Sequence, residues 1–223
     1  MNLDLQPLAL TFQLALVTTA VLLLVGLPLA TWLAYSSFRG KPVVQALISL
    51  PLVLPPSVLG FYLLLAFSPQ SLLGRWLLSW FNLQLVFSFE GLVVASVLYS
   101  LPFMVQPLQA GLESLPVALK EGAYTLGKSR LNTFCKVLLP NIKPALLTGA
   151  VLSFAHTLGE FGLVLMIGGN LPQETRVASI AIYDEVEALN YPAAHLYSGI
   201  LLVISFSILL VVHLLNKKLL KTL

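Results

Sequence analysis

The chain has 223 residues, of which 58% are hydrophobic and only 9% are charged, and its mean hydropathy is +0.92. Soluble domains carry about a quarter charged residues, so the composition excludes a soluble globular protein and predicts an integral membrane protein. The net charge of +3 comes from basic residues that gather between apolar runs. It therefore indicates membrane orientation rather than a nucleic-acid-binding surface.

Five apolar runs are long enough to cross a bilayer, which takes about 20 helical residues. In chain order they cover residues 8–35, 43–67, 92–111, 145–168 and 196–215. The first run is too long for a signal peptide and follows no basic cluster, so we expect it to be retained. The predicted fold class is an all-α integral membrane protein with one transmembrane domain over residues 1–223.

Two segments between these runs are amphipathic. Residues 72–85 place two tryptophans and four other apolar residues at helical spacing, which predicts an interfacial helix or, as the alternative, a sixth short span. Residues 174–190 are too polar to span and predict a helix in an external loop. This helix is either a docking surface for a soluble partner or a solvated cap.

The distribution of basic residues predicts the topology, because loops that are translocated are depleted of Lys and Arg. Ten of the twelve lie after the first span, between the third and fourth, or at the chain end, where Lys217, Lys218 and Lys221 stand. Only Arg75 and Arg176 lie on the other side. We therefore expect the N-terminus outside, the C-terminus in the cytoplasm, and a cytoplasmic segment at 113–143.

Residues 122–129, GAYTLGKS, match the phosphate-loop pattern G-x-x-x-x-G-K-[ST]. A phosphate loop follows a buried strand and opens a helix, whereas Gly122 follows Pro116 and a run of helix formers. The context therefore argues against nucleotide binding by this chain.

Read to its end, the same segment has the order Glu121, Gly122, Ala123, Gly127, nine residues and Val-Leu-Leu-Pro140. It resembles the cytoplasmic signature E-A-A-x3-G-x9-I-x-L-P of ABC-importer permeases, with glycine for the first alanine and valine for isoleucine. The resemblance implies a short coupling helix that sits in a groove of the ATPase and ends at a turn. The residues expected to couple to the ATPase are Leu115, Pro116, Leu119, Glu121, Gly122, Ala123, Leu126 and Gly127.

Residues 154–170 and 174–195 narrow the resemblance to the permeases of molybdate importers. Sulfate and thiosulfate permeases carry a similar LGE[FY]G stretch and are the alternative. The resemblance implies a homodimer in a bacterial inner membrane, two copies of a cytoplasmic ATPase and an extracytoplasmic oxyanion-binding protein. It implies an importer of molybdate or tungstate that works by alternating access, and no nucleic-acid partner.

The five runs contain no Lys or Arg, so an anion has to cross by weak, successive hydrogen bonds. The fourth run carries a polar stripe on one helix face. We expect this face to line the pathway at the subunit interface, although packing against another span would produce the same pattern. The predicted pathway and gate residues are Gly149, Ser153, His156, Thr157, Gly159 and Glu160.

Enzyme chemistry has little support in this sequence. The three histidines are scattered, and the single Cys135 forms neither a disulfide within the chain nor a cysteine-pair metal site. No serine lies in a G-x-S-x-G turn. We therefore expect a transport subunit without catalytic residues, cofactor or metal, and a passive channel is the remaining alternative.

Overall fold

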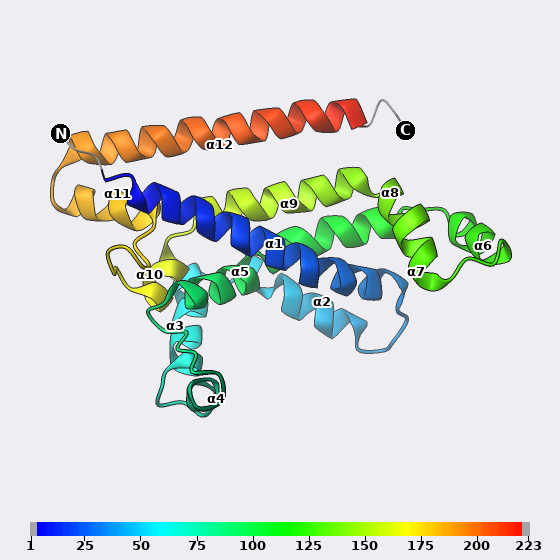
Figure 1. The fold of residues 1–223 in the computed structure, drawn as a ribbon, viewed down its shortest axis with the longest axis horizontal. Coiled ribbons are helices and arrows are strands. Elements are labelled where there is room, and N and C mark those ends of the chain that lie inside the picture. Colours follow the sequence, from blue (N-terminus) through cyan, green and yellow to red (C-terminus); the bar gives the residue numbers. More distant parts are fainter. Residues whose placement is uncertain (1–3, 220–223) are drawn as a thin grey trace.

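The computed structural model describes residues 4–219, except the side chains at 213 and 215–219. Over this part the chain is helical and contains no strand, so the predicted all-α class is confirmed. Three helices form the core and lie side by side, α1 (Gln6–Tyr35), α5 (Phe89–Glu113) and α9 (Lys143–Leu158) (Figure 1). The basic side chains predicted at the chain end, Lys217, Lys218 and Lys221, fall outside what the structure describes.

The core helices bury apolar side chains in two clusters. One, near the N-terminal end of α1, includes Leu14, Leu92 and Ile167. The other, toward the C-terminal end of α1, includes Leu33 and Met104. Because α1 is apolar on every side and about 45 Å long at 1.5 Å per residue, it can cross a bilayer while packing on one face only.

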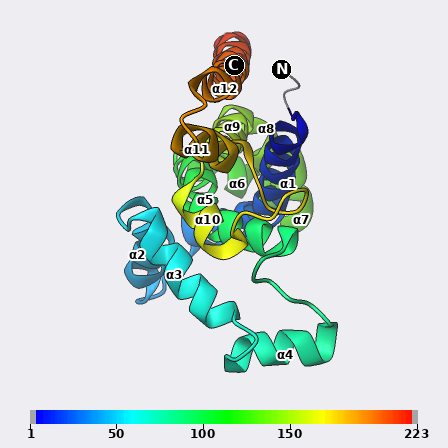
Figure 2. The ribbon, with the colours of Figure 1, turned by 90° about the vertical axis from the view of Figure 1, so that its left-hand side faces the viewer.

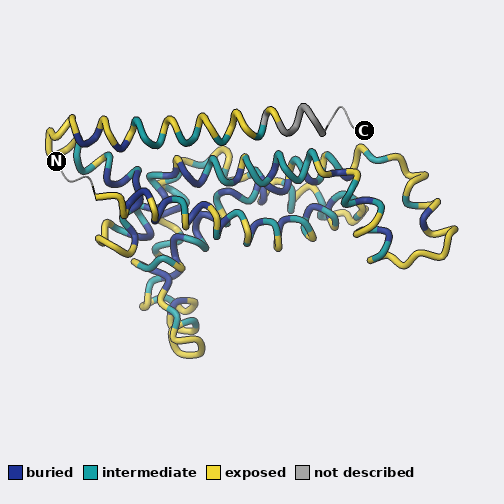
Figure 3. The backbone as a smooth tube through the Cα atoms, turned by 45° about the horizontal axis from the view of Figure 1, so that its top comes forward, coloured by how far each residue is buried: buried dark blue, intermediate teal, exposed yellow. Residues whose placement is uncertain are grey.

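The last apolar run forms α12 (Tyr191–Leu219), which lies beside α9 and is largely exposed along its length (Figure 3). Residues 174–190 contain α11 (Ala178–Glu187), which packs on α12 and α1, so the helix predicted in this segment is confirmed. The Thr11 hydroxyl of α1 accepts a hydrogen bond from the Ala178 amide at 2.7 Å. This bond holds the start of α11 against the first span.

The second apolar run is not a straight helix. It forms α2 (Lys41–Ser49), a short 3₁₀ turn η1 (Leu50–Leu52) and α3 (Pro56–Phe67), and the two halves are bent by 110°. Three prolines at 51, 55 and 56 explain the break, because proline lacks the amide donor that would continue the helix. The predicted span over 43–67 is therefore broken.

Beyond α3 the chain continues into α4 (Leu72–Phe81), which lies away from the core (Figure 2). The Ser71 hydroxyl caps its first turn by accepting a bond from the Gly74 amide at 2.8 Å. The predicted amphipathic helix is confirmed. Its ten residues cover about 15 Å, too short for a bilayer, so the alternative of a sixth span is wrong.

The fourth run is also interrupted. Just before this run the chain forms three short elements, α7 (Arg130–Thr133), a π-helical turn η2 (Phe134–Leu138) and α8 (Leu139–Asn141). Together they meet α9 at a bend of 75°. At its other end α9 stops at Leu158, and a separate helix, α10 (Gly162–Gly168), follows. The prediction of one helix over 145–168 is wrong at residues 159–161. The described residues hold three candidate spans, or up to five if each bent pair counts as one span.

Candidate functional site: a coupling helix and a cavity at the break between α9 and α10

The predicted coupling helix is α6 (Val117–Thr125), at the tip of the molecule farthest from the N-terminus (Figure 1). Pro116 stands directly before its first residue, as the sequence predicts. Gly127 follows it with a φ of +70°, the left-handed conformation that glycine adopts without strain. The amides of Gly127 and Lys128 donate to the carbonyls of Tyr124 and Ala123 at 2.9 and 3.1 Å. These bonds form a Schellman cap at the helix end.

The two faces of α6 differ in what they contact. Ala123 is buried, and Lys120 lies over the ring of Tyr35 on α1 at 4.4 Å from the centroid. On the outer side Val117 is 68% exposed and Leu126 is 78% exposed. An exposed apolar surface on a polar turn is typical of a contact with another protein. Of the other predicted coupling residues, Pro116, Leu119, Glu121, Gly122 and Gly127 are exposed and Leu115 is half-buried.

The phosphate-loop pattern lies on this helix and its cap. Gly122 is inside α6 and Lys128 follows the cap, and the element before α6 is α5, another helix. The strand and the loop of open amides that a phosphate loop requires do not occur at 122–129.

Gly122 is a position where the chain departs from the importer signature. It is exposed in the middle of α6, and a Cβ atom added there would meet nothing within 4 Å. Gly122→Ala should therefore stabilise α6 by about 1 kcal/mol and leave transport unchanged. At Gly111 the added Cβ would lie 2.6 Å from the Cβ of Ala145, so Gly111→Ala should lower the thermal unfolding midpoint of the purified subunit. Equal destabilisation by both changes would contradict this account.

The predicted polar stripe on α9 faces α5 within the same chain. Gly149, Ser153 and Thr157 are buried. A Cβ atom added at Gly149 would lie only 3.2 Å from the carbonyl oxygen of Met104, so the glycine allows the two helices to approach closely. The Thr157 hydroxyl lies 3.2 Å from the Ser100 hydroxyl of α5. In this conformation Gly149 and Thr157 join the two helices.

The far end of the stripe opens into a cavity of about 560 Å³. His156, Gly159 and Glu160 line it together with Ser57 of α3 and Tyr99 of α5. The ring of His156 lies between Tyr99 and Phe103, at 4.7 and 4.2 Å from their centroids, and its Nδ1 atom is 2.9 Å from the Ser100 hydroxyl. The cavity thus offers hydroxyl and imidazole groups at the point where α3, α5, α9 and α10 meet, while the carboxyl oxygens of Glu160 are buried in its wall.

Sequence reasoning missed Ser57, Tyr99 and Ser100 as members of this group. Ser57 follows the double proline that breaks the second run, and that break was the available signal for it. Tyr99 and Ser100 lie in an apolar helix and carry no comparable local signal.

Glu160 is the most unusual group in this cavity. Its side chain is 5% exposed, and neither carboxyl oxygen has a hydrogen-bond partner among the residues described. Its backbone carbonyl accepts a bond from the Ser179 hydroxyl of α11 at 2.6 Å, and the neighbouring Phe161 ring lies 5.1 Å from Tyr183 of α11. The break between α9 and α10 is therefore attached directly to α11.

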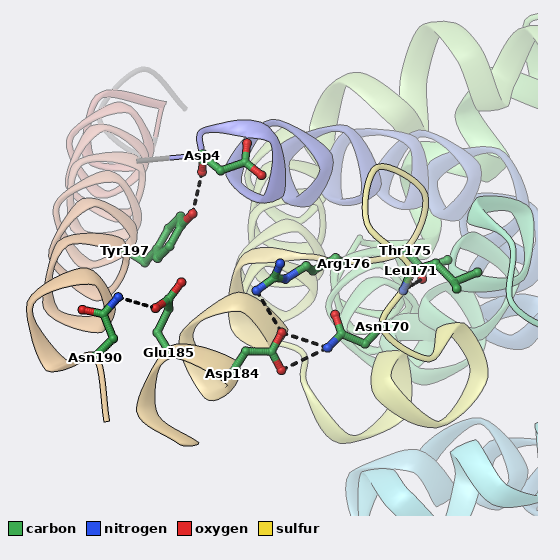
Figure 4. Close-up of polar contacts among 9 residues, drawn as sticks. All are labelled: Asp4, Asn170, Leu171, Thr175, Arg176, Asp184, Glu185, Asn190 and Tyr197. Atoms are coloured by element: carbon green, nitrogen blue, oxygen red, sulfur yellow. Dashed lines mark hydrogen bonds and ion pairs between the residues drawn. The ribbon is translucent and has the colours of Figure 1, made fainter. Parts of the chain in front are cut away.

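Figure 4 shows the polar contacts that hold α11 in place. Asp184 of α11 pairs with Arg176 at 3.0 Å and accepts a bond from the Asn170 amide at 2.8 Å. Asn190 donates to Glu185 at 2.7 Å, and the Tyr197 hydroxyl of α12 donates to the Asp4 carbonyl at 2.7 Å. These contacts fix α11, α12 and the start of α1 relative to one another.

A bundle of apolar helices with two broken runs, a polar cavity at one break and a protruding helix at the opposite end defines a multi-pass membrane transport subunit. A family profile described as "Binding-protein-dependent transport system inner membrane component" matches residues 26–221. The chain therefore belongs to this family of inner membrane transport components.

Curated relatives cover nearly the whole chain. The chain is 49% identical to the molybdenum transport system permease protein ModB of Azotobacter vinelandii, over 92% of this chain and 91% of that protein. It is 37% identical to the sulfate transport system permease protein CysT of Escherichia coli K12, over 86% of this chain and 69% of that protein.

Solved structures show the same fold at low identity. A bacterial ABC transporter involved in the import of the acidic polysaccharide alginate matches with a TM-score of 0.73 and 19% identity, over 95% of this chain and 79% of that one. The inward-facing MetNI methionine ABC transporter matches with a TM-score of 0.73 and 16% identity, over 97% and 96%. The predicted permease fold of ABC importers is confirmed.

Proposed function

We propose that this chain is the membrane-spanning subunit of an ATP-driven importer for molybdate or tungstate. The observation that carries the proposal is the 49% identity to a molybdenum permease over nearly the full length of both chains. Sulfate is the second candidate, because the chain is 37% identical to a sulfate permease. That permease extends well beyond the region that matches this chain. The subunit works as a homodimer with two copies of a cytoplasmic ATPase and an extracytoplasmic oxyanion-binding protein.

In this proposal α6 transmits the ATPase cycle to the membrane. The exposed Val117 and Leu126 side chains enter a groove of the ATPase, while the Lys120–Tyr35 contact ties α6 to α1 and α6 also packs on η2 and α7. A helix held on one side by its own subunit and on the other by a partner moves when the partner moves.

The cavity at the break between α9 and α10 is the proposed part of the anion pathway. Its lining supplies hydroxyl and imidazole groups from Ser57, Tyr99 and His156 and no fixed cation. Such groups bind a dianion weakly enough to release it. Gly149, Ser153 and Thr157, which pack on α5 in this conformation, belong to the pathway only if α5 and α9 separate during the cycle.

Reconstitution in vesicles tests the function. Vesicles with this subunit, the ATPase and the binding protein should accumulate molybdate only when ATP is supplied on the ATPase side, and an excess of sulfate should compete weakly. Strong competition by sulfate would favour the second candidate. Uptake without ATP or without the ATPase would indicate a passive channel instead.

The proposed topology makes a direct prediction about labelling. Seven basic residues, among them Arg39, Lys128 and Lys143, lie at the end of the bundle that carries α6. This end is opposite α10 and α11. In a variant without Cys135, Lys128→Cys should react with an impermeant thiol reagent only after the membrane is opened, whereas Asn82→Cys should react in intact cells. Labelling of position 128 in intact cells would overturn the topology.

The position of the phosphate-loop pattern also predicts a negative result. The purified chain alone should bind no ATP, and Lys128→Ala should transport at close to the normal rate, because Lys128 is an exposed residue after a helix cap. Equilibrium binding of radiolabelled ATP to the isolated subunit provides the measurement. Measurable affinity that disappears with Lys128→Ala would contradict the permease assignment.

A further inference from the structure

A second cavity lies beside the coupling helix and belongs to neither the ATPase contact nor the anion pathway. Its volume is about 670 Å³, and it is bounded by the end of α1, by α6 and by the turn through α7 and η2. Its walls include Tyr35, Lys120, Tyr124, Arg130, Leu131 and Phe134.

The polar wall of this cavity is positively charged. Lys120 and Arg130 both line it, and neither pairs with a carboxylate in the portion of the chain that the structure describes. Glu113, which lines the adjoining cavity together with Lys120, is already engaged by Lys41 at 3.3 Å and by Gln109 at 2.9 Å. The two cations are therefore available to an anion.

The opposite wall is apolar and open. Leu131 is 74% exposed, and Phe134 continues the same wall. On the same end of α1, Trp32 and Phe38 lie with their ring centroids 4.9 Å apart, and both are exposed. Tryptophan is enriched at the headgroup level of a membrane, so the end of α1 that bounds this cavity suits the level where a lipid headgroup meets its acyl chains.

We propose that this cavity binds an anionic phospholipid, with the phosphate between Lys120 and Arg130, the tyrosine hydroxyls beside it and an acyl chain along Leu131 and Phe134. Basic pockets at the ends of membrane helices suit such headgroups. A bound lipid bridges α1 to α6 and α7 and so holds the coupling helix against the span. The identity of the leaflet, the cytoplasmic one, rests on the proposed topology.

Native mass spectrometry of the full chain in detergent, titrated with phosphatidylglycerol, tests the site. The double variant Lys120→Gln/Arg130→Gln should bind this lipid about 30-fold more weakly, since each of the two basic residues contributes about 1 kcal/mol to such an attraction and about 1.4 kcal/mol corresponds to a factor of ten. The matched control Lys128→Gln/Lys136→Gln removes the same charge from the same segment at exposed positions outside the cavity and should change the affinity less than twofold. Equal loss in both variants, or no loss in the first, would overturn the proposal.

Two further arms separate a lipid from a free oxyanion. Leu131→Asn, at an exposed position that should not affect folding, should weaken phosphatidylglycerol binding, and inorganic phosphate in large excess should not displace the lipid. Displacement by phosphate together with no effect of Leu131→Asn would assign the cavity to a small anion and reject the lipid. The measurement uses neither ATP nor molybdate, so loss of molybdate uptake with lipid binding intact would refute only the proposed function.

Discussion

Gly127→Val should reduce ATP-dependent transport by about tenfold or more without preventing insertion of the subunit in the membrane. Gly127 has a φ of +70°, where an ordinary residue costs about 1–2 kcal/mol and a β-branched one costs more. An added Cβ would meet nothing within 4 Å, so the whole penalty is in the backbone. Since about 1.4 kcal/mol corresponds to a factor of ten in an equilibrium, the cap of α6 should be largely lost.

Asparagine is the matched control at this position, because it adopts the left-handed conformation more readily than other non-glycine residues. Gly127→Asn should keep transport within about twofold of the normal rate, and Gly127→Ala should fall between the two. The measurement is ATP-driven molybdate uptake in reconstituted vesicles, with co-purification of the ATPase as a second readout. If valine and asparagine are equally harmful, the requirement is for a small side chain at the ATPase contact and not for the turn.

Glu160→Leu should also reduce uptake about tenfold, whereas Glu160→Gln should retain at least half of it. The carboxyl group is buried in the cavity and has no hydrogen-bond partner among the described residues. A fixed negative charge there would repel a dianion, and an ionisable group in such a place is costly enough to indicate a role. We expect that role to be hydrogen bonding in another state of the cycle, which glutamine can reproduce and leucine cannot.

The surroundings of Glu160 explain why a change here should have a large effect. Its carbonyl accepts a hydrogen bond from Ser179, and Phe161 packs on Tyr183, so the turn between α9 and α10 is linked to α11. Thermal unfolding of the purified variants controls for loss of fold. If glutamine is as inactive as leucine while both subunits remain folded, the charge itself is required and the hydrogen-bonding role is wrong.

The coupling helix illustrates what could be predicted from local sequence. Proline before a helix and glycine after it act through their own dihedral angles, so Pro116 and Gly127 predict where α6 begins and ends without knowledge of its neighbours. The apolar length of each run and the asymmetry of the basic residues are local properties in the same sense. The class of protein follows from them.

The polar stripe on α9 shows where local reasoning stops. Small and hydroxyl-bearing residues at helical spacing suit a water-lined pathway and a close helix contact equally well. Only the position of α5 decides that Gly149 and Thr157 meet Met104 and Ser100 in this conformation, while His156 and Glu160 reach a cavity. These contacts join residues more than 40 positions apart, and a periodic pattern carries no information on them.

By itself, the sequence of this protein determined that it is a helical membrane subunit, which end carries the basic segment, and where α6 begins and ends, because hydropathy, charge and dihedral preference act over a few residues. The tertiary structure alone decided the 110° bend before α3, the break at residues 159–161 and the meeting of Lys120 with Tyr35. Prolines and glycines permit a bend at many positions, but the direction of the chain after each one depends on which distant helix offers a packing surface.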